Sequence, residues 1–247
     1  MIVAAALSGL PEVHQGDDLA ALLLAAATTL ADGDVLVVAH KVVSKAEGRV
    51  VALAAVEPGE RARALAADHG KDPRVVEVIL RESSAIVRSR PGVLICRTPH
   101  GFVCANAGVD ASNAGRPGEL ILLPADPDAS ARALRRRLRA LSGVAPAIVV
   151  SDSFGRAWRV GQCDVAIGAA GLAPVDDWRG RRDAAGRELA ATIVAVADEA
   201  AAAADLARAK DGGEPAVLVR GLEHHVTDAD GPGAAALVRE RSEDLFL

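Results

Sequence analysis

Tyrosine is absent from this sequence of 247 residues, and aromatic residues make up only 2% of it. Hydrophobic residues nevertheless reach 51% and charged residues 25%, so a wholly disordered chain is excluded and Ala, Val, Leu and Ile must fill the core. No heptad or triplet repeat runs through the chain, which excludes a coiled coil and a collagen-like helix. The length is sufficient for one large domain or two small ones.

The chain also lacks a surplus of basic residues. Its net charge is −5 at pH 7, which excludes a general nucleic-acid binder but allows a nucleotide to be held by a few local cations. The Ala-rich stretches at 19–31 and 189–207 are too short or too interrupted by acidic residues to cross a membrane. Three cysteines without CxxC spacing predict reduced thiols, and no leader precedes the first strand, so we expect a cytoplasmic protein.

Strand and helix patterns alternate along the chain and predict a mixed α/β class. After a strand that begins at Met1, further strands are expected at 35–39, 50–56, 93–97, 101–105, 119–123, 147–151 and 216–220. Helices are expected at 18–31, 58–69, 73–89, 124–142, 187–209 and 232–241, whereas 152–187 shows little helical period. No GxGxxG or GxxxxGK[ST] occurs, which argues against a Rossmann or P-loop fold. We predict a single domain over 1–247, with a candidate lobe junction near 212–215.

Lysine is scarce, with four residues against twenty-four arginines. Two of the four, Lys41 and Lys45, follow the predicted strand at 35–39, and they would share one face of a helical turn because they are four residues apart. A Lys ammonium is a compact charge suited to phosphate, so this pair could hold a polyphosphate. The alternative is a basic turn that is simply solvated, since exposed charge is common.

Two further segments place oxygen-bearing side chains where apolar runs end. Segment 100–115 carries Asp110 and Asn113 among small residues, and the run at 147–151 leads directly into Asp152 and Ser153. Magnesium and manganese ions are bound in proteins by one or two carboxylates together with phosphate oxygens. The two aspartates could therefore hold one divalent cation jointly.

Each of these segments also has an ordinary structural interpretation. Segment 100–115 could be a turn that its own Asn and Asp side chains close. Arg156 and Arg159 could clamp acidic groups of a substrate, or they could pair with the acidic cluster near Asp176. The six histidines lack metal-ligand spacing, and no serine stands in a GxSxG context.

Five groups of residues, in order along the chain, resemble the coenzyme F-420:L-glutamate ligase family. The resemblance extends from about residue 8 to 222, and five motifs in one order are far more specific than any one of them. The matching segments are Ser8–Val13 with Gly16–Leu19, Lys41–Arg49, Gly101–Asn113, Ser151–Arg156 and Asp176–Gly180.

The resemblance implies a ligase that uses GTP to add L-glutamate, through γ-linked amide bonds, to the deazaflavin precursor of coenzyme F-420. The terminal carboxylate of the precursor would attack the γ-phosphate of GTP, and the amino group of glutamate would displace phosphate from the acyl phosphate. The resemblance also implies a two-lobed fold with mixed sheets and an intertwined homodimer. Some relatives carry a C-terminal nitroreductase-like domain, which we do not expect in a chain of this length.

Residue by residue, the resemblance assigns three sets of contacts. Asp110 and Asp152 would be the catalytic carboxylates and would bind Mg²⁺ or Mn²⁺ together with Ser153, with K⁺ as a further candidate cation. Lys45 would contact phosphate and Lys41 would face away. The remaining nucleotide contacts would be Leu10, Pro11, Glu12, Val13, His40, Asn113, Lys210, Asp211, Gly212 and Gly213.

Two other interpretations remain open beside the leading one. The chain could be a non-catalytic nucleotide-binding or regulatory relative, or a ligase for a different carboxylate acceptor. The presence of Asp110, Asn113, Asp152, Ser153 and Lys45 together favours an enzyme. The residues do not distinguish between one carboxylate acceptor and another.

Overall fold

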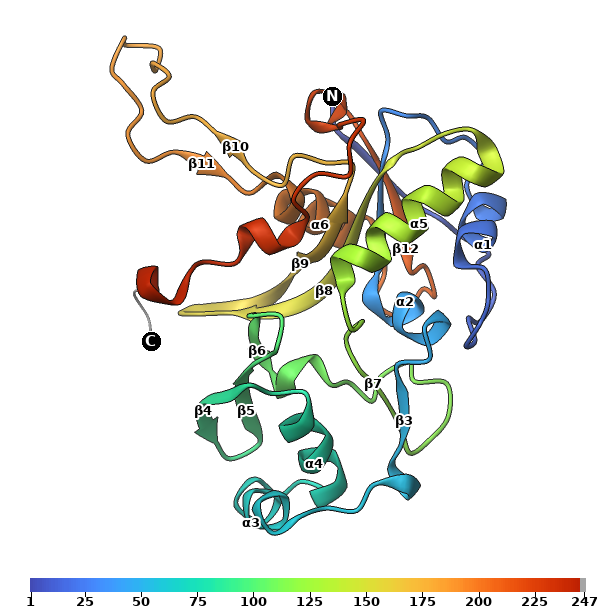
Figure 1. Cartoon of the computed structure of the whole chain (residues 1–247), viewed down its shortest axis with the longest axis vertical. Coiled ribbons are helices and arrows are strands. Elements are labelled where there is room, and N and C mark those ends of the chain that lie inside the picture. The colour runs from blue at the N-terminus through green and yellow to red at the C-terminus, as the bar shows by residue number, and fades with distance from the viewer. Residues whose placement is uncertain (245–247) are drawn as a thin grey trace.

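A five-stranded sheet organises the computed structural model, which describes residues 1–244 (Figure 1). Its strand order is β1 (Val3–Ala6), β12 (Ala216–Arg220), β2 (Val35–Ala39), β8 (Ala147–Arg156) and β9 (Arg159–Ala170). Only β2 and β8 run parallel; the other neighbours are antiparallel. The mixed α/β prediction is confirmed, and a sheet with one parallel pair is unlike the mostly parallel sheet of a Rossmann fold.

Alternating side chains give this sheet two apolar faces. In β2, Leu36 and Val38 lie in one core cluster while Val35 and Val37 lie in the other, because successive strand residues point to opposite faces. Helices α1 (Leu19–Ala26), α2 (His40–Ala46) and α5 (Pro127–Ser142) contribute to the first cluster, and α6 (Val196–Ala207) to the second. The sheet is therefore buried on both sides, which holds the ends of its central strands rigidly.

A second group of elements between residues 50 and 121 has a core of its own, in which Ile79, Leu94 and Leu120 are buried. It lies below the main sheet in Figure 1 and contacts it where β6 meets β8. Its elements are β3 (Val50–Ala52), α3 (Glu60–His69), α4 (Pro73–Arg81), β4 (Ala85–Arg90), β5 (Val93–Arg97), β6 (Val103–Ala105) and β7 (Glu119–Ile121). A separate ribbon, β10 (Asp176–Asp177) and β11 (Ile193–Val194), projects from the opposite end of the molecule (Figure 1).

Local sequence explains where several helices begin and end. Asp126 accepts a hydrogen bond from the Ala129 amide and is followed by proline, a residue well suited to the first helical turn, so α5 begins there. Gly143 ends α5 in the left-handed conformation that glycine adopts without strain. The predicted helix to about 142 is confirmed for this reason.

The structure adds most to the sequence prediction in 152–187. The sequence shows little helical period there, in agreement with the structure, but it did not predict the long hairpin in which β8 continues to Arg156 and β9 occupies Arg159–Ala170. Glycines in β9 interrupt the strand pattern, and Gly168 is needed because a Cβ there would lie 2.2 Å from the Pro127 carbonyl oxygen. A glycine that signals a turn in sequence here permits close packing of α5 on the sheet.

Three helix predictions were also too long. The expected helix at 73–89 ends at Arg81, and residues from Ala85 pair as β4. The Ala-rich helix begins at Val196 rather than near 187, and 232–241 forms short 3-10 turns. Helix propensity gives way in each case to strand pairing or to packing on the sheet.

Two smaller predictions can be compared directly with the structure. All three cysteines are free, as expected. Among the described residues, no helix is long and apolar enough to cross a membrane. The single-domain interpretation and the lobe junction near 212–215 stay predictions, and residues 245–247 lie outside the described part of the chain.

Candidate active site

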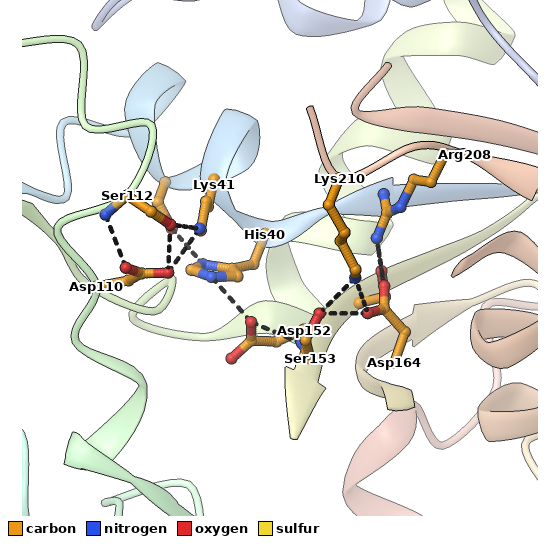
Figure 2. A network of polar contacts seen from close by, with 11 residues as sticks. His40, Lys41, Asp110, Ser112, Asp152, Ser153, Asp164, Arg208 and Lys210 are labelled. Carbon is orange, nitrogen blue, oxygen red and sulfur yellow. Dashed lines mark hydrogen bonds and ion pairs between the residues drawn. The ribbon is translucent and has the colours of Figure 1, made fainter. Parts of the chain in front are cut away.

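The parallel pairing of β2 and β8 brings two predicted segments together. Ala39 is the register partner of Ser151, so His40 and Lys41 leave β2 beside the point where Asp152 and Ser153 follow in β8. Carboxyl ends of parallel strands are a common place for ligand sites in α/β proteins. Two segments more than one hundred residues apart thus form one polar edge (Figure 2).

Asp110 joins this edge from the second group of elements. Its backbone pairs with Ile121, and its carboxylate accepts hydrogen bonds from the Ser112 amide at 2.7 Å and the Ser112 hydroxyl at 2.8 Å. Lys41 Nζ lies 2.6 Å from Asp110 Oδ2. Burial opposes the charge of Asp110, but these hydrogen bonds and the Lys41 ammonium outweigh it and lower the pKa of the carboxyl. The turn is closed by its own side chains, as the structural alternative proposed, and also faces the site.

The turns on both sides of Asp110 contain unusual backbone conformations. Asn106, Ala107 and Asn113 all have positive φ, and a Cβ at Gly108 would lie 2.7 Å from the Leu123 side chain. Alanine has no polar side chain to favour this conformation, so Ala107 carries local strain that the surrounding packing maintains. The strain fixes the direction in which the following Asp110 segment crosses the site.

Between the two aspartates lies His40, which begins α2 and is only 2% exposed. Figure 2 places it between the Asp110 side chain and Asp152. Its Nε2 atom is 3.2 Å from Asp152 Oδ1, and within the described chain this buried nitrogen forms no hydrogen bond. A buried polar atom without a partner is costly unless a ligand or water completes it.

A second polar cluster surrounds Asp164, which is 0% exposed. Its carboxylate accepts hydrogen bonds from Ser151 at 2.9 Å and Ser153 at 2.5 Å, and it forms ion pairs with Arg208 and Lys210. Burial opposes its charge, but the Ser153 hydrogen bond and the two cations outweigh burial and lower its pKa. Ser153 and Asp164 are register partners on β8 and β9, so the hairpin that the sequence reading missed creates this cluster.

The third part of the site is the loop that precedes α1. Glu12 accepts a hydrogen bond from Lys45 at 2.5 Å, and both Glu12 and Asn113 line a cavity of about 400 Å³. Val13 is buried in the core, so its side chain is closed to a ligand. The predicted nucleotide contacts at Glu12, Lys45 and Asn113 therefore lie in one region, with Leu10 and Pro11 in the same loop.

The predicted loop after α6 also lies at this edge. Lys210 Nζ donates to Ser153 Oγ at 2.9 Å, and Glu214 accepts a hydrogen bond from Ser8 at 2.9 Å. The intervening residues Asp211, Gly212 and Gly213 are exposed. The loop thereby connects the start of the chain to the end of β8.

Two interpretations of basic residues are wrong. Lys41 does not face away, because its ammonium binds Asp110 and Ser112. The alternative that Arg156 pairs with the acidic cluster near Asp176 is also wrong. Its guanidinium donates to the Val160 carbonyl at 3.0 Å, closing its own hairpin, and Asp176 pairs with Arg181. The alternative that it clamps a substrate stays a prediction.

Sequence reasoning missed Asp164 as a site residue. The signal was a single carboxylate in the otherwise apolar or small run Cys163–Ala170, which requires a partner if it is buried. Its partner Arg208 directly follows α6, two residues before the predicted nucleotide contact Lys210. Cys104 is not a further candidate nucleophile, because burial and the nearby charge of Asp152 raise the pKa of its thiol to about 12.

One divalent cation is compatible with Asp110 and Asp152. In the contacts made by the described residues, Asp152 uses Oδ1 and leaves Oδ2 for a ligand, while His40 contributes the buried nitrogen that lacks a partner. No cluster of three or more His, Cys, Asp or Glu side chains within the described chain could hold a metal by itself. The donor set therefore suits Mg²⁺ or Mn²⁺ that keeps open positions for phosphate and water.

Carboxylates, hydroxyls and three of the four lysines converge on the ends of two parallel strands, which is the kind of site that binds phosphorylated ligands. The sequence model of the F420-0:gamma-glutamyl ligase family matches residues 9–221. The chain belongs to this family, and the resemblance stated from the sequence is confirmed.

Relatives that carry the name coenzyme F420:L-glutamate ligase match the chain over almost its whole length. The protein of Methanopyrus kandleri is 52% identical over 237 residues, which cover 95% of this chain and 93% of the relative. The protein of Archaeoglobus fulgidus is 46% identical over 240 residues, covering 96% and 93%. The protein of Methanothermobacter thermautotrophicus is 45% identical over 243 residues, covering 96% of each chain.

Proposed function

We propose that this protein is a GTP-dependent ligase that joins L-glutamate, through a γ-linked amide bond, to the deazaflavin precursor of coenzyme F-420. The observation that carries the proposal is the convergence of Asp110, Asp152 and the scarce lysines at the carboxyl ends of β2 and β8. Membership of the ligase family supports the choice of acceptor and of glutamate. We further propose a cytoplasmic homodimer, as the resemblance implies.

The nucleotide would lie across the loop at 10–13, α2 and the loop at 210–213. Lys45, buried beside Glu12, is placed to neutralise phosphate charge. Asn113 would contact the nucleotide from the cavity that it shares with Glu12. A divalent ion held by Asp110 and Asp152 would supply further neutralisation of the phosphate oxygens.

Amide formation would then proceed in two displacements. The precursor carboxylate attacks the γ-phosphorus of GTP, forms an acyl phosphate and releases GDP. The glutamate amine attacks the acyl carbon, loses a proton and expels phosphate. Positioning and charge neutralisation are the main requirements of phosphoryl transfer, which agrees with a site of ammonium groups and carboxylates.

A ligase for another carboxylate acceptor would use the same groups, because they face the phosphates and not the remainder of the acceptor. A non-catalytic nucleotide-binding relative would have no physical need for both Asp110 and Asp152 at one site (Figure 2). This observation favours an enzyme over a passive binding protein.

Mass spectrometry of the product tests the proposal. The protein is incubated with the authentic precursor, L-glutamate, GTP and Mg²⁺, and the expected product gains one or more glutamate masses while GTP is converted to GDP. ATP in place of GTP and D-glutamate in place of L-glutamate are the matched controls. GTP binding without turnover, or turnover that does not require the precursor, would contradict the proposal.

A further inference from the structure

Lys210 is held by three oxygen-bearing side chains. Its Nζ atom lies 2.9 Å from Ser153 Oγ and 3.3 Å from Asp164 Oδ1, and it also forms an ion pair with Asp205 at the end of α6. Figure 2 shows the lysine directed at Ser153 and Asp164, on the side of β8 away from His40. One hydroxyl and two carboxylates are the oxygen ligands that a bound cation would also use.

The charges around Lys210 balance without any added ion. Asp164 and Asp205 contribute two negative charges, and Arg208 and Lys210 contribute two positive charges. Lys210 pairs with both aspartates, and Arg208 pairs with Asp164 as well. The Lys210 ammonium therefore lies in an environment whose negative charge it helps to neutralise.

A second metal ion does not fit beside Ser153. The resemblance assigned Ser153 to the metal ligands, but its hydroxyl already donates to Asp164 and accepts from Lys210. A divalent ion at this oxygen would have to displace the ammonium and would be repelled by Arg208, which is fixed on the same buried carboxylate. Asp152, by contrast, forms no ion pair with any Lys or Arg of the described chain.

We propose that the Lys210 ammonium takes the place of a second cation, so that each chain binds one divalent ion between Asp110 and Asp152 and needs no potassium ion. A lysine ammonium and K⁺ both carry one compact positive charge and both bind oxygen. Lys210 then provides a fixed charge beside Ser153, at the end of the strand that carries Asp152. The inference rests on the proposed nucleotide site, but its main test requires no turnover.

Manganese binding measures the number of ions directly. The protein is titrated with Mn²⁺ in the presence of a non-hydrolysable GTP analogue, and free Mn²⁺ is followed by electron paramagnetic resonance. We expect one bound ion per wild-type chain. We expect Lys210→Met, which removes the charge but keeps the length of the side chain, to bind either a second Mn²⁺ or one K⁺. Competition by K⁺ for the added site distinguishes these two results, and either of them supports the inference.

Turnover provides a second readout. Wild-type kcat should change less than about twofold between sodium and potassium buffers, whereas Lys210→Met should lose at least about tenfold in sodium and recover part of it in potassium or ammonium. Lys210→Arg, which keeps a positive charge, should stay independent of K⁺. Lys71→Met, remote from the site at the end of α3, is the matched control and should behave as wild type.

Two results would overturn the inference: two Mn²⁺ bound by the wild-type chain, or no added cation and no K⁺ response in Lys210→Met. If the wild-type chain bound no Mn²⁺ while the variant gained a cation, Lys210 would still replace an ion and the proposed divalent site would be at fault. A failure of this inference is therefore distinguishable from a failure of the proposed function. Thermal melts of all variants confirm that each is folded.

Discussion

Two carboxylates with lysine partners lie on opposite sides of Asp152 and Ser153. Asp110 is 42% exposed and bound by Lys41 and Ser112, whereas Asp164 is 0% exposed and bound by Arg208, Lys210 and two serines. The pKa of each is lowered by its partners against the effect of burial. Similar local chemistry therefore occurs in two very different environments.

The difference between the two clusters lies in what can replace their partners. A half-exposed ion pair is weak, so Lys41 can release Asp110 to a metal or turn to a phosphate at small cost. A buried carboxylate that loses a cation is left without compensation, so Asp164 must keep Arg208. We infer that the exposed cluster is available for ligands and that the buried one holds the β8–β9 hairpin and Lys210 in place.

The largest expected effect is on turnover. Asp110→Asn and Asp152→Asn should each lower kcat by about 10³-fold, and the double variant should lose little more, because groups that hold one ion act as a unit. The free energy of unfolding should fall by less than about 1 kcal/mol for Asp110→Asn, since its ion pair is partly solvated. Steady-state kinetics and urea denaturation of the four proteins in this cycle check both expectations.

Additive losses in kcat would contradict the prediction that Asp110 and Asp152 act as a unit. They would mean that the two aspartates act separately, and a large loss of stability in Asp110→Asn would show that Asp110 is structural like Asp164.

Next in size is a loss of stability at the buried cluster. Asp164→Ala should lower the free energy of unfolding by about 3–5 kcal/mol, because Arg208 would remain buried without its carboxylate. Asp164→Asn keeps the shape of the side chain and should be less severe. Urea denaturation followed by circular dichroism measures the change, and Asp110→Ala is the matched control. Equal losses in the free energy of unfolding at Asp164 and Asp110 would contradict the distinction between a buried structural cluster and an exposed one.

A smaller effect distinguishes the two lysines of α2. Lys45→Ala should raise the KM for GTP by about tenfold, because a buried ammonium loses little phosphate attraction to solvent. Lys41→Ala should raise it less, since Lys41 is shared with Asp110. Initial rates at varied GTP, with melting temperatures as a folding control, compare the two variants. If Lys41→Ala were the more damaging, the assignment of the phosphate site to Lys45 would be wrong.

The smallest expected effect concerns a carboxylate that, unlike Asp110 and Asp164, has no cationic partner in the described part of the chain. Asp198 on α6 is partly buried and accepts a hydrogen bond from the Ala166 amide at 2.9 Å. No Lys or Arg of the described residues forms an ion pair with it, and desolvation raises the pKa of its carboxyl. A native pKa above the unfolded value gives a contribution to stability that is full at low pH and is lost as pH rises through the native pKa. Asp198→Asn should thus be more stable than wild type at pH 7, with the difference disappearing below about pH 4.

Urea denaturation of Asp198→Asn and wild type at several pH values between 4 and 7 provides the measurement. A difference that does not change with pH, or a variant that is less stable at pH 7, would show that Asp198 has a stabilising partner and that burial alone does not set its pKa.

Much of the site was predictable because it follows strand ends. Asp152 and Ser153 come after a run of apolar residues, and a strand that is buried on both faces has few alternatives. The scarcity of lysine directed attention to Lys41 and Lys45, and the family resemblance added Lys210. Asp164 was not found because its strand contains Gly168, and in a sequence a glycine commonly indicates a turn.

The sequence by itself determined the alternation of elements, the family, and Asp110, Asp152 and the lysines as candidates for the site, because these depend on local pattern and on residue type. Only the tertiary structure decided which lysine binds which carboxylate. Lys41 and Lys45 share a helix, yet one binds Asp110 and the other Glu12, residues that are brought there by different loops. Whether a carboxylate is exposed like Asp110 or buried like Asp164 depends on long-range packing, and burial determines whether its partner can be exchanged for a ligand.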